Sequence, residues 1–470
     1  MDIIYKTFKT PKNYYVYDRN TNSVLLINQE EYNALNNLKS SLNVSENKNK
    51  IRKYQDIGYL KENVVVEIRH PSTDFLEHHI THRMTQITLQ VTQKCNLRCG
   101  YCVYSGNHHN RSHSNKVMTF ETAKKAIDLI ASHSLELDEI SIAFYGGEPL
   151  LEMELIKQCV DYVEETLEGK NIVYAITTNG TLLTPKLADY FADHNINITI
   201  SLDGSRNEHD INRRFANGKG SFDVIMSNIE KIKKHNPSFI KKISINTVIN
   251  PKSDYSCVKE FFETDDIIKD ASVGLNLVDS GTGRDSYNEY VDDFWIVRRY
   301  EYFKFLLALT KRIDKKYSTK LLKTQKSTID HFYSTLQQKQ QISTIQHHGG
   351  PCIPGARRLF VTVDGDLFPC ERVSEVSETV HLGNLSNGIN IKKAEEILNV
   401  GKVTEQECLS CWALLHCSMC VAQCDDGEKI CKCTKLKNCE QSKQKVLDDL
   451  LEVSALKEFS YDFKEDSLYE

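Results

Sequence analysis

Three closely spaced cysteines constrain this chain more than any other feature of its sequence. Cys95, Cys99 and Cys102 follow the spacing CxxxCxxC, so one short loop supplies three thiolates. Thiolates are the usual ligands of iron–sulfur clusters, and a four-iron cluster held by only three of them keeps one iron open for an outside ligand. A structural zinc site is the alternative. It needs four ligands, and no fourth cysteine is close in the sequence, although His108 and His109 offer imidazole ligands.

The composition fits an enzyme that binds metal in a reducing compartment. The chain has 470 residues, 15 cysteines and a formal net charge of −5. Its length predicts about three domains, and its charge gives no reason to expect nucleic acid or acidic lipid as a partner. We find no signal-peptide core and no apolar run long enough for a membrane span. The thiols are therefore expected to ligate metal in the cytoplasm rather than to form disulfides.

Residues 85–280 alternate between short apolar segments and longer amphipathic ones. This pattern predicts an α/β fold with a parallel sheet and right-handed crossovers. The expected strands are 86–91, 140–144, 172–177, 196–202 and 243–249, and the expected helices are 120–132, 155–167, 185–194 and 222–235.

Tyr101 precedes the third cysteine and completes a CxxxCxφC motif, in which φ is aromatic. With this motif the segment resembles the radical S-adenosylmethionine (SAM) superfamily. The resemblance implies a SAM-binding [4Fe–4S] cluster at the three cysteines. It also implies that residues 85–280 form the partial (β/α)6 barrel of that family, with the chemistry at the C-terminal ends of the strands.

Polar motifs at the predicted strand ends are similar to the SAM-binding motifs of that family. The turn GGEP at 146–149 allows close approach of the backbone, and its carboxylate can accept a hydrogen bond from the SAM ammonium. Asn179 and Ser201 end the next two strands, and Arg213 can pair with the SAM carboxylate. The alternatives are a turn cap for Asn179 and a surface salt bridge for Arg213. The implied SAM-binding residues are Tyr101, Gly146, Gly147, Glu148, Pro149, Asn179, Ser201 and Arg213.

Residues 1–75 are expected to form a separate small region. Its expected elements are a hairpin over 14–17 and 23–27, a helix from Asn28 to Leu38, a second helix over 50–60 and a linker over 70–73. Strands followed by helices in a region of this size resemble the winged-helix element that recognises precursor peptides in peptide-modifying enzymes. The resemblance implies docking of a leader peptide, and a purely structural cap is the alternative.

Residues 346–450 contain a second set of cysteines. Cys352 and Cys370 lie in a CxnGxxxxC segment that predicts a hairpin, and further cysteines crowd between Cys408 and Cys439. The pattern resembles the SPASM extension, which binds two auxiliary [4Fe–4S] clusters. A zinc ribbon at the CxxC pair is the alternative, but it would leave many thiolates unused.

The same resemblance implies a ligand set for each auxiliary cluster. One cluster would use Cys408, Cys411, Cys417 and Cys439. The other would use Cys352, Cys370 and one of Cys420 or Cys424. Here the spacing departs from the common pattern, because two residues rather than three separate Cys417 from Cys420, and Cys431 and Cys433 are additional. The fourth ligand of this cluster therefore stays open, with a substrate thiolate as one candidate.

The whole chain resembles the maturases of cysteine-rich ribosomal peptides. It combines a docking element, a barrel and a SPASM region, and a helical bridge is expected over 281–345. The resemblance implies sulfur-to-carbon thioether formation on a precursor peptide with a leader, as in sactipeptides and ranthipeptides. It also implies an electron donor such as flavodoxin or ferredoxin. A sulfatase maturase, which forms formylglycine, is the second interpretation. Those enzymes carry an Asp base directly after the cysteine that matches Cys370, and Glu371 stands there as the candidate catalytic base. A non-enzymatic zinc scaffold is the third.

Overall fold

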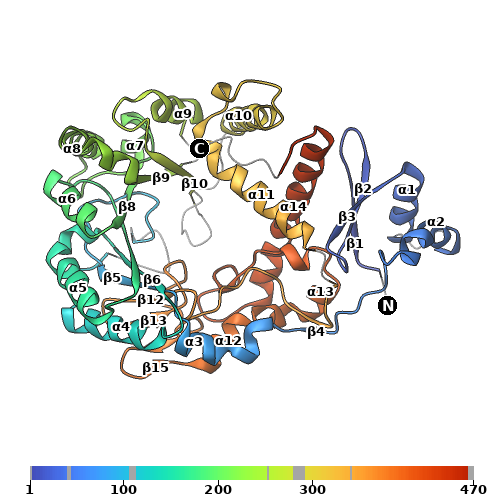
Figure 1. Ribbon diagram of the computed structural model, residues 1–470, viewed down its shortest axis with the longest axis horizontal. Helices are drawn as coiled ribbons and strands as arrows, with labels where there is room; N and C mark the ends of the chain where they lie inside the picture. The colour runs from blue at the N-terminus through green and yellow to red at the C-terminus, as the bar shows by residue number, and fades with distance from the viewer. Residues whose placement is uncertain are drawn as a thin grey trace.

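The apolar segments between residues 86 and 277 pair side by side in one curved sheet (Figure 1). The strand order is β10-β9-β8-β7-β6-β5-β12-β13-β14-β15, and neighbours from β10 to β12 are parallel. The six consecutive parallel strands are β5 (Gln86–Thr92), β6 (Glu139–Gly146), β7 (Asn171–Thr178), β8 (Ile196–Ser201), β9 (Ile243–Ile249) and β10 (Ser272–Leu277). The five strands expected in this region are confirmed within two residues at each end, and β10 was not expected.

Amphipathic helices connect the parallel strands and cover the outer face of the sheet (Figure 1). Thr119 caps the first of them by accepting a hydrogen bond from the Thr122 amide at 3.1 Å, and Thr184 caps another just before Pro185. The helices are α4 (Phe120–His133), α5 (Met153–Thr166), α6 (Pro185–Asp193), α7 (Arg206–Asn212), α8 (Phe222–His235) and α9 (Tyr255–Thr264). The four expected helices are confirmed.

Apolar and polar side chains alternate along β5, so that one face of the strand packs in the core and the other faces the barrel interior. Ile87, Leu89 and Val91 of β5 belong to the large apolar core beneath the helices. Gln90, between them, is buried and hydrogen-bonds polar groups instead. Because successive side chains of a strand point to opposite faces, the inner face of the barrel is polar at this level.

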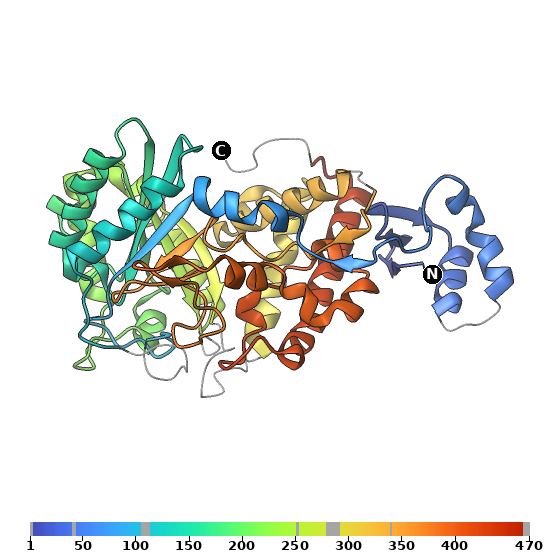
Figure 2. The same cartoon turned by 90° about the horizontal axis from the view of Figure 1, so that it is seen from below.

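The structure describes residues 3–39, 44–104, 113–250, 253–278, 292–338 and 341–463. His108 and His109 lie outside these ranges. Figure 2 shows the N-terminal element at one end of the long axis, the helix-covered sheet at the other, and the C-terminal region between them. None of the helices in the described ranges is both long enough and apolar enough to cross a membrane.

The N-terminal element is a three-stranded antiparallel sheet followed by two helices. Its elements are β1 (Tyr5–Lys9), β2 (Tyr14–Asp18), β3 (Ser23–Ile27), α1 (Gln29–Lys39) and α2 (Val44–Asp56). The expected hairpin is confirmed. The Asn28 cap is confirmed as well, since its Oδ1 accepts a hydrogen bond from the Glu31 amide at 2.9 Å.

Two expectations for this region were wrong. The second helix begins six residues before Lys50, because its first half is polar and gives no apolar signal. Its end at Asp56 lies near Gly58, as expected, where φ is +102°. The expected linker over 70–73 is partly helical. Pro71 begins a short 3₁₀ helix in which His70 Nδ1 accepts a hydrogen bond from the Ser72 amide. That helix continues into α3 (Leu76–His82).

The second half of the chain wraps back onto both earlier parts. Two helices, α10 (Asp292–Leu309) and α11 (Lys323–Gln337), occupy the expected bridge. Then follow β12 (Leu359–Val361), β13 (Asp366–Phe368), β14 (Gly383–Asn384), β15 (Gly388–Ile389), α12 (Ile391–Leu398), α13 (Glu405–Leu409) and α14 (Lys432–Glu458). Two-residue strands β4 (Glu67–Ile68) and β11 (Ile345–Gln346) pair in parallel. The boundary expected at residue 450 falls inside α14, which reaches the N-terminal element.

Short 3₁₀ helices complete the described secondary structure. They are Pro71–Phe75, Pro149–Glu152, Pro237–Lys242, Lys315–Tyr317, Lys320–Leu322, Val400–Thr404, Leu414–His416 and Val421–Gln423.

Candidate functional site

The cysteine loop leaves the end of β5 and is held against the end of β6 by two glycines. The Gly147 amide donates to the Thr92 carbonyl at 2.9 Å, and the Glu148 amide donates to the Lys94 carbonyl at 2.8 Å. A Cβ at Gly146 would lie 2.1 Å from the Thr92 oxygen, and one at Gly147 would lie 2.1 Å from the Lys94 oxygen. No residue with a side chain fits this approach. The glycines therefore fix the entry to the cysteine loop rather than merely forming a turn.

Three thiols gather in this loop. Cys99 is buried, and Cys95 and Cys102 are half-buried. Burial is the main cause that raises the pKa of Cys99 to about 12 and that of Cys95 to about 11, and the charges of neighbouring thiols contribute to both shifts. Such thiols stay protonated unless a cation replaces the proton, which is what ligation to iron does.

The surroundings of these thiols fit an iron–sulfur cluster. The Leu97 amide donates to Cys95 Sγ at 3.4 Å, and the Tyr104 amide donates to Cys102 Sγ at 3.5 Å. Asn179 Nδ2 lies 3.9 Å from Cys95 Sγ. N–H groups directed at thiolate sulfur orient such ligands and tune the cluster that they bind.

Glu148 connects the ends of two neighbouring strands. It is fully buried, and its carboxylate accepts hydrogen bonds from the Leu150 amide at 3.0 Å, Thr178 Oγ1 at 2.7 Å and the Asn179 amide at 2.7 Å. Burial raises the pKa of this carboxyl, and these three donors oppose the shift. These three hydrogen bonds fix the carboxylate beside the ends of β6 and β7, and the expected contact of the 146–149 turn with the SAM ammonium stays a prediction. Pro149, beside it, is buried and begins a 3₁₀ helix.

Asn179 lies beside the cysteine loop. It also caps a turn, which was the alternative to a role in SAM binding. Its Nδ2 donates to Asn96 Oδ1 at 2.8 Å, and its Oδ1 accepts from the Thr181 amide at 3.0 Å. Asn96 Nδ2 in turn donates to Thr181 Oγ1 at 2.8 Å. Asn96 was not singled out from the sequence, because a lone Asn between two cysteines carries no pattern of its own. Ser201 is buried at the end of β8, opposite Asn246 of β9.

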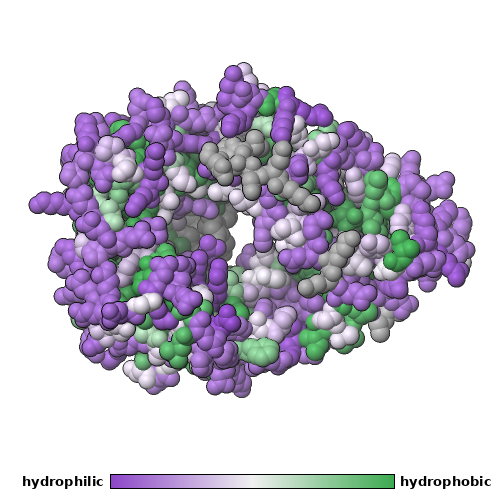
Figure 3. Space-filling view, in the orientation of Figure 1, coloured by the Kyte–Doolittle hydropathy of each residue, from purple (hydrophilic) through white to green (hydrophobic). Residues whose placement is uncertain are grey.

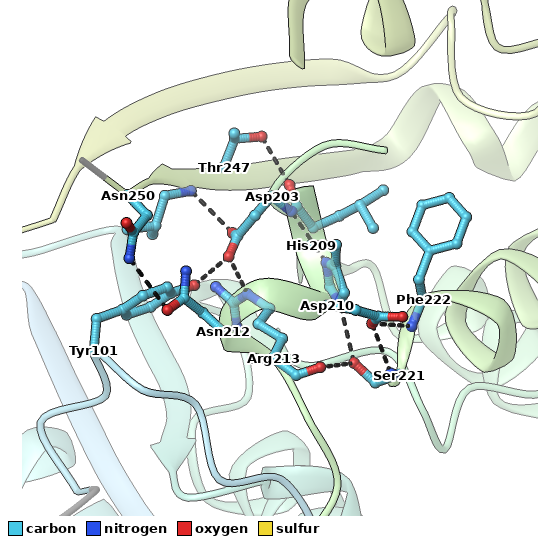
Figure 4. A network of polar contacts seen from close by, with 12 residues as sticks. Tyr101, Asp203, His209, Asp210, Asn212, Arg213, Ser221, Phe222, Thr247 and Asn250 are labelled. Carbon is cyan, nitrogen blue, oxygen red and sulfur yellow. Dashed lines mark hydrogen bonds and ion pairs between the residues drawn. The ribbon is translucent and has the colours of Figure 1, made fainter. Parts of the chain in front are cut away.

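Arg213 forms a buried ion pair, not the surface salt bridge that was its alternative. Its Nε donates to Asp203 Oδ2 at 2.8 Å, and its guanidinium carbon lies 5.3 Å from the centre of the Tyr101 ring (Figure 4). The Tyr101 hydroxyl donates to the same Asp203 oxygen, and the Val248 amide donates to the other oxygen at 3.0 Å. The aromatic residue of the cysteine motif is thereby tied to the ends of β8 and β9. Burial raises the pKa of Tyr101 well above its usual value.

A second group of contacts holds this ion pair in place (Figure 4). The Asp203 amide donates to His209 Nδ1 at 3.2 Å, and His209 Nε2 lies 2.9 Å from Ser221 Oγ. The Ser221 hydroxyl donates to the Arg213 carbonyl at 2.7 Å, and Asp210 Oδ1 accepts from the Ser221 amide at 2.9 Å. Burial lowers the pKa of His209 to about 4, so the ring is neutral and can accept the Asp203 amide.

Polar side chains also meet inside the barrel near the C-terminal hairpin. Gln90 Nε2 donates to the Tyr104 hydroxyl at 2.8 Å and to Glu375 Oε1 at 2.9 Å. Glu371, the candidate base, is ion-paired with Arg358, whose Nη1 lies 2.9 Å from its Oε1. Sequence reasoning missed the Gln90–Glu375 contact, because these residues are far apart in the chain.

Four cysteines of the C-terminal region line one cavity of about 280 Å³. They are the four that the family pattern assigned to one cluster: Cys408, Cys411, Cys417 and Cys439. We call this the four-thiol cavity. The side chains of His348, Lys435 and Lys443 also line it. None of these three was singled out from the sequence.

A second group of cysteines forms at the hairpin. Burial is the main cause that raises the pKa of Cys370 to about 11, and the charges of Glu371 and then of Cys420 add to the shift. Burial also raises the pKa of Cys420, and the charge of Cys352 adds to that shift. Cys420 therefore lies near both hairpin thiols. Cys424 is fully buried, and its Sγ donates to the Cys420 carbonyl at 3.2 Å. Burial raises its pKa to about 12, and its charged neighbours include thiols of both groups.

Among the described residues, no group of three or more His, Cys, Asp or Glu side chains has the arrangement of a metal-ion site. The thiols therefore mark candidate cluster sites by the cavity they share and by the donors around them, not by finished coordination geometry.

Comparison with known proteins gives a consistent family relationship for the barrel. Residues 89–264 match the family described as the radical SAM superfamily. An uncharacterized protein of Methanocaldococcus jannaschii is 40% identical over 36% of this chain and 54% of its own length. A cysteine-type anaerobic sulfatase-maturating enzyme of Clostridium novyi is 31% identical over 39% of this chain and 49% of its own length. The radical SAM cyclopropyl synthase TigE of Paramaledivibacter caminithermalis is 28% identical over 44% of this chain and 43% of its own length.

The match spans about half the length of these curated relatives. A solved structure described as native anSMEcpe with bound AdoMet is 18% identical, with a TM-score of 0.55, and the likeness covers 78% of this chain and 99% of that one. At this identity the likeness shows a shared α/β fold with a mostly parallel central sheet.

Proposed function

We propose that this radical SAM enzyme, whose residues 89–264 carry the superfamily match, is a maturase that forms sulfur-to-carbon thioether links in a cysteine-rich ribosomal peptide. The observation that carries the proposal is the joining of three parts in one chain. A cysteine loop lies at the strand ends of the barrel, a four-thiol cavity lies in the C-terminal region, and a small β-sheet element is docked beside that cavity.

The residues at the strand ends fit a SAM-binding [4Fe–4S] cluster, which the radical SAM domain implies. Cys95, Cys99 and Cys102 would hold it, and the Tyr101 and Asn179 side chains lie beside their loop. When bound, the cluster supplies one electron to SAM, whose cleavage gives a 5′-deoxyadenosyl radical that takes a hydrogen atom from the substrate. The buried polar contacts around Asp203 keep this loop in a single position.

The chemistry of a thioether link sets what the chain must provide. Each link removes two hydrogens from the peptide. One would leave as a hydrogen atom and the other as the thiol proton. One electron would also have to leave the peptide as the sulfur–carbon bond forms, and an oxidised iron–sulfur cluster held by the C-terminal cysteines would supply the acceptor. Glu371, next to Cys370, is our candidate acceptor for the proton. Its ion pair with Arg358 holds the carboxylate in place.

The N-terminal element is anchored firmly enough to present a peptide to the rest of the enzyme. Arg19, at the end of β2, is buried and donates to the carbonyls of Leu409 and Cys411 at 2.8 Å and 3.2 Å. Glu458 at the end of α14 accepts a hydrogen bond from the Tyr15 hydroxyl at 2.8 Å. The element therefore contacts the loop that carries one of the four cavity thiols.

An edge strand of this element is the proposed leader site. Of the strands that the structure describes, only β2 pairs with β3, so β3 has an edge at which a peptide strand can add. Leu26 on β3 is 62% exposed. Figure 3 shows an opening through the middle of the molecule, between the helix-covered sheet and the C-terminal region, and such an opening supports access for a peptide chain.

Formylglycine formation, the reaction of a sulfatase maturase, is the second candidate. The likeness to the Clostridium novyi enzyme favours it. Glu371 stands where sulfatase maturases carry an Asp. Its side chain is one methylene longer, so the carboxylate can still act as a base but lies farther from the backbone.

The product distinguishes the two reactions. The test uses a short cysteine-rich peptide with a leader, sought among the reading frames beside the gene. The peptide is treated with enzyme, SAM and dithionite and is then reduced and alkylated. We expect the peptide mass to fall by two hydrogens per link, with one fewer alkylated cysteine per link, because a thioether resists thiol reductants. An aldehyde that reacts with a hydrazide, formed with loss of sulfur, would overturn the proposal in favour of the sulfatase-type reaction.

Leader docking has a separate test in the full chain. Leu26→Asp should weaken binding of a fluorescent leader peptide at least about fivefold, since strand addition buries the exposed apolar side chains of the edge. Ile296→Asp on α10 is the matched control, because Ile296 is 64% exposed and lies outside the N-terminal element. Equal affinity for both variants and the parent would reduce the element to a structural cap.

A further inference from the structure

Two side chains other than cysteine give the four-thiol cavity a polar wall. Lys435, in the first turn of α14, and His348, just before the hairpin, both line it and are both buried. Neither side chain is accounted for by the thiol pattern or by the barrel. Their position against a group of thiols is the observation that carries the inference.

Lys435 is a buried cation that faces neutral atoms of the protein. Its Nζ donates to the Val400 carbonyl at 3.0 Å and to Thr404 Oγ1 at 2.8 Å, and it lies 4.0 Å from Cys408 Sγ. Among the described residues no carboxylate forms an ion pair with it. Glu407, which lines the same cavity, is paired with Lys432 at 2.6 Å instead. A buried charge is costly unless an opposite charge lies nearby, and thiolates in the cavity, with Cys408 Sγ 4.0 Å from Nζ, would supply that counter-charge.

His348 presents a ring to the cavity whose two nitrogens have no hydrogen-bond partner among the described residues. Its position is set by its neighbour. His347 Nδ1 lies 2.9 Å from the His348 carbonyl, and His347 Nε2 accepts from the Gly401 amide at 2.8 Å. An imidazole always carries at least one N–H, and leaving a buried donor unpaired costs free energy. A sulfur acceptor in the cavity would satisfy it.

We propose that Lys435 and His348 raise the reduction potential of an iron–sulfur cluster held in the four-thiol cavity. The inference rests on the proposed function for the presence of that cluster. A reduced cluster carries one more negative charge than an oxidised one. A nearby cation and N–H groups directed at sulfur therefore stabilise the reduced form more than the oxidised form. A raised potential suits this cavity to receive the electron that leaves the peptide when a sulfur–carbon bond forms.

The test is a redox titration of the holoenzyme, followed by electron paramagnetic resonance. The signal of this cluster is identified as the one that Cys439→Ala removes. At a fixed solution potential, Lys435→Met should lower the ratio of reduced to oxidised cluster at least about tenfold, which corresponds to about 59 mV for one electron. His348→Leu should lower it in the same direction. Lys435→Arg and His348→Gln should recover most of the shift, because each keeps an N–H donor.

Lys443→Met is the matched control. Lys443 lines the same cavity, but it is paired with Glu440 at 2.8 Å and its side chain is 34% exposed, so solvent and the carboxylate already compensate its charge. Its removal should change the ratio less than about threefold. An equal shift for the two lysines, or no shift for Lys435→Met and His348→Leu, would overturn the proposal.

Two further outcomes are distinguishable. Loss of iron from Lys435→Met and His348→Leu would assign these residues to holding the loop, and the tuning role would be wrong. If the parent enzyme lacked any signal that depends on Cys439, the cluster itself would be absent and the proposed function would lose its auxiliary site. A normal cluster whose potential the variants do not move would overturn only the present inference.

Discussion

The buried Asp203–Arg213 ion pair should be the most sensitive polar contact of the barrel. The two side chains are 3% and 8% exposed, and Asp203 also accepts hydrogen bonds from Tyr101 and from the Val248 amide. Asp203→Asn keeps the size of the side chain and removes its charge. It leaves a buried guanidinium without a counter-charge and disturbs the contact that holds the cysteine loop.

The expected loss is large. Removing one partner of a buried ion pair costs about 3–5 kcal/mol of folding free energy, because the remaining charge stays desolvated. An exposed pair is worth about 0–1 kcal/mol. Asp223 and Arg206 supply that comparison in the same barrel, with side chains that are 59% and 61% exposed. Asp223→Asn is therefore the matched control.

Urea unfolding of the full chain under anaerobic conditions, followed by circular dichroism, measures both variants. We expect Asp203→Asn to lower the free energy of unfolding by about 3 kcal/mol or more and Asp223→Asn by less than about 1 kcal/mol. SAM binding should weaken for Asp203→Asn alone, because Tyr101 loses its anchor. If both variants lose the same stability, the ion pair does not carry the energetic role assigned to it here.

Two further changes have definite expected outcomes. Gly147→Ala should lower the iron content of the enzyme in a metal assay, because its Cβ would lie 2.1 Å from the Lys94 oxygen at the entry to the cysteine loop. Gly274→Ala in β10, where the nearest atom is 3.8 Å away, should bind iron like the parent enzyme. Glu452→Gln should stabilise the protein by roughly 1–3 kcal/mol at pH 8 and little at pH 5. Burial raises the pKa of this carboxyl to about 7, and the Tyr302 hydroxyl donates to it. The stability that its proton contributes is therefore full below about pH 4.5 and is lost as the pH rises through 7. Thermal unfolding of the variant and the parent at both pH values measures the difference, and an equal effect at about pH 5 and about pH 8 would contradict the prediction.

Most of the barrel could be predicted because its strands are apolar and bounded by turn residues. The strand over 243–249 and the helix over 222–235 end where the sequence indicated. The first half of α2 could not be predicted, since it is polar and its helix depends on packing beneath the sheet of the N-terminal element. The hydrophobic periodicity of a sequence gives only a weak signal for a polar helix of this kind.

The candidate site divides in the same way. The spacing of the cysteines indicated the cysteine loop, and the family resemblance grouped the four thiols that line one cavity. Side-chain direction was not predictable, so the hydrogen bonds of Glu148 to Thr178 and to the Asn179 amide were not expected from the sequence. The place of Lys435 depends on how α14 folds back across the chain, and nothing local to its sequence encodes that.

The central claim is that Cys95, Cys99 and Cys102 hold the cluster that cleaves SAM. The most direct test replaces all three with Ala in the full chain and measures iron content together with 5′-deoxyadenosine after reduction with dithionite. We expect the variant to lose about four irons per chain, to keep any iron that the C-terminal cysteines bind and to form no 5′-deoxyadenosine. Reductive cleavage of SAM that persisted in this variant would contradict the account.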